Sequence, residues 1–157
     1  MTANVVVQFL NGLAGASSLF LVAAGLSIIF GVSRIVNFAH GSLYMLGMYL
    51  AWSLIGFFGR GSVPGFWAGV LGAALAVGLI GVLVEILVLR RVYRAPEMFQ
   101  LLATFALVLV VKDAALHVWG AEDLLGPRAP GLRGAVEILG RRVPEYDLLL
   151  VAIGPAV

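Results

Sequence analysis

The stretch GLSIIFGVSRIVNFAHGSLY, residues 25–44, decides the architecture of this chain. An apolar segment without a single charge runs into Arg34, Asn37 and His40, and a second apolar segment follows. Polar groups placed between two apolar segments of membrane length cost free energy unless they are buried in protein or line a wet cavity. We therefore interpret residues 34–41 as a joint at which two transmembrane helices turn towards a polar pathway.

The composition excludes an ordinary soluble domain. Hydrophobic residues make up 62% of the 157 residues and charged residues only 11%, against roughly 25% charged residues in soluble domains. The lipid bilayer is the expected solvent, and no nucleic-acid partner is expected because Lys and Arg stand between apolar runs. The sequence contains no cysteine, and its two histidines lack a second ligand at a useful spacing, so we expect no metal site and no cofactor.

Segments of about 20 apolar residues predict an all-α polytopic bundle. We expect four full helices and the start of a fifth, at about residues 9–30, 38–58, 64–89, 97–119 and 146–157. The last segment is too short to cross a bilayer, so residues 1–157 are expected to be the N-terminal part, a fragment, of a single transmembrane domain. Residues 120–144 are predicted to form an outer loop with a short β-hairpin around Gly140.

Small residues predict where helices approach each other closely. Gly65, Gly69 and Ala73 recur every four residues in the third segment, which is typical of tight helix crossing in lipid. In the first segment Asn11 and Ser18 share a helical face with glycines. Packing is the simpler interpretation of that face, and lining of a transport path is the alternative.

The joint supplies the other path candidates, Asn37, His40 and Gly41. Asn37 is a good N-cap for a helix that starts at Phe38, since its side chain can accept a hydrogen bond from the first free amides. In the functional interpretation Asn37 and His40 lie beside the pathway. In the alternative, Asn37 is only a cap and Arg34 only extends to the lipid head groups.

Three charges fall inside predicted spans. Glu85 precedes the basic run of Arg90, Arg91 and Arg94, so a Glu–Arg pair near the head groups is the first interpretation and a proton relay the second. Lys112 and Asp113 interrupt the fourth segment, and at least one of them is expected to face the bundle interior or an aqueous cleft.

Basic loops also predict the orientation in the membrane. The run from Arg90 to Arg94 is expected in the cytoplasm, which places Arg34 on the same side. The N-terminus, the turn at Arg60 and residues 120–144 are then expected outside.

Residues 25–47 (GLSIIFGVSRIVNFAHGSLYMLG) resemble the N-terminal signature of the branched-chain amino-acid ABC transporter permeases, in particular the H-type subunit of leucine–isoleucine–valine uptake systems. The runs LRRVYRAPE (89–97) and QLLATF (100–105) are similar to the loop and fourth helix of the same family, and residues 136–146 to its outer segment.

The resemblance implies a multi-pass permease of the bacterial inner membrane. It implies as partners a second, homologous permease subunit, two cytoplasmic ABC ATPases and a periplasmic amino-acid-binding protein, and it implies alternating access driven by ATP. The chain has no Gly-x-x-x-x-Gly-Lys-Ser/Thr loop, so a partner is expected to hydrolyse the ATP and the chain itself is expected not to be an enzyme.

Two other classes compete with this interpretation. An ion-coupled secondary transporter or channel would use Glu85, Lys112 and Asp113 as coupling groups. A membrane enzyme is disfavoured because neither histidine has a paired nucleophile, and His117 stands alone at the end of a helix.

Overall fold

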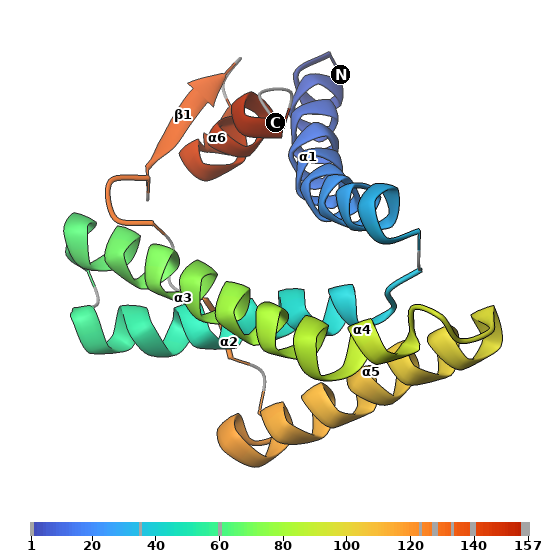
Figure 1. Ribbon diagram of the computed structural model, residues 1–157. Helices are drawn as coiled ribbons and strands as arrows, with labels where there is room; N and C mark the ends of the chain where they lie inside the picture. The colour runs from blue at the N-terminus through green and yellow to red at the C-terminus, as the bar shows by residue number, and fades with distance from the viewer. Residues whose placement is uncertain are drawn as a thin grey trace. The chain divides into compact units, whose positions relative to one another are not determined.

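The computed structural model describes residues 2–34, 36–59, 61–122, 124–126, 129–132, 134–138 and 141–154. It is helical apart from one small antiparallel hairpin (Figure 1). The chain divides into two compact units, one of residues 1–25 and 128–157 and the other of residues 26–127.

The described elements follow the predicted order. They are α1 (Thr2–Ser33), α2 (Ala39–Phe58), α3 (Val63–Val84), a π-helix η1 (Glu85–Leu89), α4 (Arg90–Val92), α5 (Glu97–Trp119), β1 (Ala135–Ile138), β2 (Arg141–Pro144) and α6 (Glu145–Ile153). Four helical stretches among the described residues are long and apolar enough to cross a membrane: Asn4–Ser33, Ala39–Phe58, Val63–Val92 and Glu97–Trp119. The predicted all-α transmembrane architecture with a short hairpin is confirmed.

Two helix boundaries differ from the sequence prediction by five residues or more. The first helix starts at Thr2 rather than near Phe9, because residues 2–8 contain no proline, glycine or charge that would stop a helix. The third segment is an α-helix only to Val84, after which the π-helix η1 and the short helix α4 continue the same helical stretch to Val92. The predicted turn residue Arg60 and residues 155–157 lie outside the described residues.

The small-residue face of α3 packs on α2, as predicted. Gly65, Gly69 and Ala73 are buried, and an added Cβ at Gly69 would lie 2.8 Å from the backbone nitrogen of Ile55 in α2. The opposite side of α3 is an exposed leucine stripe, formed by Leu71, Leu75 and Leu79. One face of α3 therefore meets protein and the other suits lipid.

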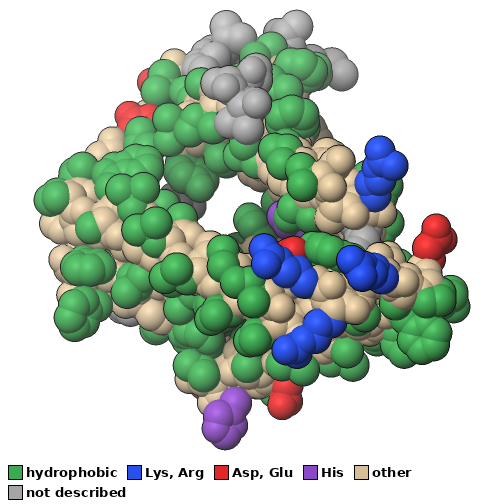
Figure 2. Space-filling model, in the orientation of Figure 1, with side chains coloured by type: hydrophobic (Ala, Val, Ile, Leu, Met, Phe, Trp, Pro, Cys, Tyr) green, Lys and Arg blue, Asp and Glu red, His purple; other side chains and the backbone are tan. Residues whose placement is uncertain are grey.

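The third span of this unit, α5, also packs against α2. The indole Nε1 of Trp119 donates a hydrogen bond to Ser53 Oγ at 2.8 Å, and its ring stacks on Tyr49 with 5.2 Å between centroids. Because α3 and α5 both contact α2, α2 is the central helix of residues 26–127. Figure 2 shows the hydrophobic side chains that cover these helices.

The other unit contains the hairpin. β1 and β2 pair antiparallel with Val136 opposite Val143, and Val143 is fully buried. The amide of Glu145 donates to the carbonyl of Gly134 at 3.2 Å, which connects the start of α6 to the hairpin. Farther along, Gly154 lies so close to Ser17 of α1 that a Cβ there would be 2.6 Å from Ser17 Oγ.

Candidate functional site

The joint begins where α1 ends. Ser33, the last residue of α1, turns its hydroxyl back to donate to the carbonyl of Ile29 at 2.8 Å. Arg34 follows with φ of 57°, the left-handed conformation that a helix end normally gives to glycine. An arginine in this conformation costs about 1–2 kcal/mol, and such strain is concentrated at functional sites.

Asn37 lies directly before Phe38, the cap position of α2 that makes no side-chain capping hydrogen bond, so the predicted cap at Asn37 is one residue early. Its side-chain Oδ1 accepts a hydrogen bond from the Ala39 amide at 3.0 Å, and its carbonyl accepts one from the His40 amide at 3.2 Å. The Asn37 side chain is only 6% exposed. Between the two helices Asn37 is therefore a buried polar residue, whereas Arg34, Val36 and Phe38 are exposed.

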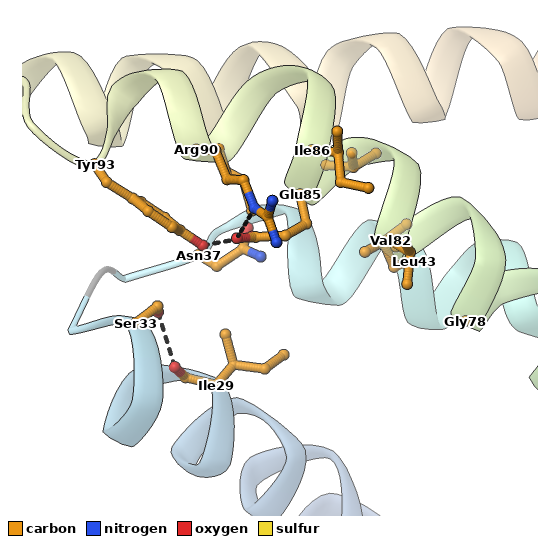
Figure 3. A pocket seen from close by; sticks show the side chains of 13 residues that line it. Ile29, Ser33, Asn37, Leu43, Gly78, Val82, Glu85, Ile86, Arg90 and Tyr93 are labelled. Carbon is orange, nitrogen blue, oxygen red and sulfur yellow. Dashed lines mark hydrogen bonds and ion pairs between the residues drawn. The ribbon is translucent and has the colours of Figure 1, made fainter.

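A cavity of about 430 Å³ lies beside this turn. Its wall is formed by the end of α1, the joint, the start of α2 and the helical stretch that runs from α3 through η1 and α4 to the following loop. The lining residues are Ile29, Ser33, Asn37, Leu43, Gly78, Gly81, Val82, Val84, Glu85, Ile86, Leu89, Arg90 and Tyr93. Figure 3 shows the polar side chains Asn37, Glu85, Arg90 and Tyr93 gathered at one end, with Leu43 and Val82 at the other.

The π turn explains how the charged end of the cavity forms. On an α-helix of about 3.6 residues per turn, Glu85 and Arg90 would point roughly 140° apart. In η1 the Arg90 amide instead bonds to the Glu85 carbonyl five residues back, and this wider turn brings the two side chains towards one face. The predicted Glu–Arg pair is present, with Arg90 Nε 3.9 Å from Glu85 Oε1.

Tyr93 completes the charged end, and the sequence analysis missed it. Its hydroxyl donates a hydrogen bond to Glu85 Oε2. Burial, reinforced by this bond and by the Glu85 charge, raises the pKa of the Tyr93 phenol to about 12. The phenol is therefore a neutral donor at physiological pH. The sequence contains no signal for this contact, because it depends on the π turn.

His40 and Gly41, the other candidates at the joint, do not line the cavity. His40 lies half-buried in the first turn of α2, as predicted, and Gly41 is exposed. No heavy atom lies within 4 Å of a Cβ built on Gly41, so no tight contact among the described residues requires this glycine. Their part in a transport path stays a prediction.

Asn11 and Ser18 belong to the other unit. Asn11 is exposed and lines a shallow hollow on α1 with Asn4 and Gln8. Ser18 is half-buried, and its hydroxyl donates to the carbonyl of Ala14 at 3.2 Å. A path role for either residue likewise stays a prediction.

Lys112 and Asp113 are exposed on α5. They border an open surface hollow with Leu109, Val110 and Leu116, so among the described helices neither charge is covered. Their predicted position against a bundle interior or an aqueous cleft stays a prediction. No group of three or more His, Asp or Glu side chains that could hold a metal ion occurs in the described part of the chain.

Comparison with known proteins gives one family and several relatives. Residues 8–124 match the family model described as the branched-chain amino acid transport system permease component. The chain is 25% identical over 124 residues to the high-affinity branched-chain amino acid transport system permease protein LivH of Salmonella typhimurium strain LT2 and to LivH of Escherichia coli K12. It is 27% identical over 113 residues to the corresponding protein BraD of Pseudomonas aeruginosa.

These alignments cover 76% of this chain and 40% of each LivH protein, and 69% of this chain and 37% of BraD. The chain thus spans well under half the length of the curated relatives it matches. No solved structure matches it.

Proposed function

Because this chain belongs to the branched-chain amino acid transport system permease family, we propose that it forms part of the translocation pathway of an ATP-driven importer of branched-chain or related amino acids. The chain is a multi-pass protein of the bacterial inner membrane, with four candidate spans among the residues that the structure describes. Permeases of ABC transporters are typically non-catalytic membrane subunits, in agreement with the absence of a phosphate-binding loop from the sequence.

One observation supports the pathway most directly. Between apolar helices, the buried residue Asn37 borders a cavity that Glu85 also lines. Polar backbone and side chains at such a position are tolerated in a membrane protein where they line a wet cavity. A pathway for a polar solute would use these polar groups. Two helices that face lipid would instead have to bury them at a cost in free energy.

The proposed mechanism is alternating access. ATP-driven closure of two cytoplasmic ATPases shifts the populations of inward-open and outward-open helix bundles, and a periplasmic binding protein releases the amino acid between this subunit and a homologous second permease. The residues of this chain bind and orient the solute, and no covalent step is required of them. The strained turn at Arg34 and the π turn at Glu85–Leu89 are two places where the transmembrane helices can bend.

The energy source distinguishes this proposal from an ion-coupled carrier that uses Glu85, Lys112 and Asp113. The full-length protein is reconstituted in proteoliposomes with its partner subunits, so that ATP and the proton gradient are set independently. We expect leucine uptake to stop without ATP and to continue when an ionophore collapses the proton gradient. Uptake that follows the gradient and ignores ATP would contradict the proposal.

A further inference from the structure

The charged end of the cavity carries one negative charge, on Glu85, and one positive charge, on Arg90. Glu85 is half-buried, and its carboxylate accepts a hydrogen bond from Tyr93. Arg90 Nε stands 3.9 Å away, farther than the 2.7–2.9 Å or so of a direct charge-assisted hydrogen bond. A carboxylate has about four acceptor positions and a guanidinium five donors. Both groups therefore keep hydrogen-bonding capacity for a ligand.

Asn37 adds a neutral donor at the same end. The bond from the Ala39 amide identifies Oδ1 as the acceptor, so the amide nitrogen Nδ2 lies on the other side of the group. No acceptor for Nδ2 occurs among the described residues, although the side chain is more than nine-tenths buried. Every fully enclosed side-chain nitrogen and oxygen in the described part of the chain does have a partner. Nδ2 therefore keeps access to open space, and the cavity is the space that Asn37 borders.

The other end of the cavity suits a branched aliphatic group. Leu43, Val82 and Ile86 line it, and Gly78 and Gly81 leave room, because no heavy atom lies within 4 Å of a Cβ built on either glycine. The volume of about 430 Å³ falls within the range of roughly 300–1,000 Å³ that is usual for small-ligand sites.

We propose that this cavity is a binding site for a zwitterionic α-amino acid with an aliphatic side chain. The ammonium group binds Glu85, the carboxylate binds Arg90 and the Asn37 Nδ2 amide, and the side chain packs against Leu43, Val82 and Ile86. Tyr93 is a positioning residue that holds the Glu85 carboxylate. This inference rests on the proposed function and adds to it the atoms that select the solute.

The charges explain the choice of a zwitterion. A ligand with only an ammonium group would pair with Glu85 and leave the charge of Arg90 uncompensated. A ligand with only a carboxylate would pair with Arg90 and leave the charge of Glu85 uncompensated. The Glu85 side chain is 33% exposed and the Arg90 side chain 67% exposed, so an uncompensated charge costs more at Glu85. Selection thus depends on the presence of both charges on one small molecule.

The test uses the absence of cysteine from the 157 residues. Ser33→Cys and, independently, Val82→Cys place a thiol in the cavity wall of the full-length transporter, reconstituted with its partners and free of other reactive cysteines. The measured quantity is the rate of thiol alkylation by a small maleimide, with and without leucine. We expect leucine to slow alkylation about tenfold at both positions. Ala121→Cys, in the exposed segment after α5, serves as the control that leucine does not protect.

Two comparisons test the charged end. Isoamylamine lacks the carboxylate of leucine and 4-methylpentanoate lacks the ammonium, and neither is expected to protect the thiols at concentrations where leucine does. Glu85→Gln is expected to raise the leucine concentration needed for half-protection about tenfold or more, as expected for loss of a hydrogen bond to a charged group. Glu97→Gln, which removes an exposed carboxylate that does not line the cavity, is expected to leave that concentration unchanged.

The outcomes separate this site from the function it rests on. A transporter that imports leucine while both cavity thiols stay unreactive, or react equally fast with leucine present, overturns the site and leaves the proposed function intact. Protection by the amine or the acid alone, or unaltered protection in Glu85→Gln, overturns the recognition of a zwitterion. Failure of the unmodified transporter to import any aliphatic amino acid would instead overturn the proposed function.

Discussion

Gly69→Ala is expected to destabilise the packing of α2 on α3 although it adds a single methyl group. The new Cβ would lie 2.5 Å from Ile55 Cγ1 and 2.8 Å from the Ile55 backbone nitrogen. A side chain can rotate away, but a backbone nitrogen moves only with its helix. Overpacking of this kind costs about 1–3 kcal/mol. The free energy of unfolding of the full-length protein in detergent is the quantity to measure.

Gly78→Ala is the matched control on the same helix. No heavy atom lies within 4 Å of a Cβ at Gly78, so the substitution keeps the packing and gains up to about 1 kcal/mol from the higher helix propensity of alanine. Equal stabilities of the two variants would contradict the close approach of α2 and α3 at Gly69.

Asn37→Ala is expected to lower leucine uptake by the full-length transporter about tenfold or more, with assembly intact. The substitution removes the Nδ2 donor that borders the cavity, and the loss of a hydrogen bond to a charged group corresponds to at least that factor. It also removes the hydrogen bond from the Ala39 amide to Asn37 Oδ1, which costs about 0.5–1.5 kcal/mol of stability. Initial uptake rates are therefore normalised to the amount of assembled complex.

Asn37→Ser separates the two roles of this side chain. A serine hydroxyl can also accept a hydrogen bond from the backbone two residues on but lacks the amide nitrogen, so we expect stability to recover while uptake stays low. His40→Ala is also expected to impair uptake, by a smaller factor, because His40 does not line the cavity. Normal uptake kinetics in both alanine variants would remove Asn37 and His40 from the pathway.

The sequence alone predicts the spans and the tight crossing because these follow from local rules. Hydropathy marks each membrane-length segment, and the spacing of Gly65, Gly69 and Ala73 marks the face that another backbone can approach. The hydrogen bond from the Ala39 amide to Asn37 is equally local, since it joins residues two apart. Each of these predictions needs only the residues of one contiguous segment.

The π turn and the conformation of Arg34 could not be predicted in this way. The run EILVL from Glu85 to Leu89 is an ordinary apolar sequence for an α-helix. A left-handed residue after a helix is usually glycine, and arginine gives no such sign. Neither feature has a signal in the local sequence, because residue propensity is only a weak guide to conformation.

Which residues form the site also depends on the tertiary structure. Asn37 and Glu85 were both candidates from the sequence, but only the π turn and the packing of α2 on α3 place them in one cavity. Asn11 and Ser18 were further candidates for the path, although packing was their simpler interpretation, and they lie in the other unit. Composition identifies polar residues in apolar helices, whereas the fold decides which of them face the same space.

The water content of the cavity beside the joint is the quantity to measure next. A nitroxide spin label is attached to Leu43→Cys in the assembled full-length transporter. Position 43 lines the cavity, and its substitution leaves the hydrogen bond between the Ala39 amide and Asn37 intact. Leu75→Cys, on the exposed leucine stripe of α3, provides the lipid-facing reference. We expect the label at 43 to collide mainly with a water-soluble nickel chelate and the label at 75 mainly with oxygen. Dominance of oxygen at both positions would show that the joint faces lipid, and would contradict a polar pathway there.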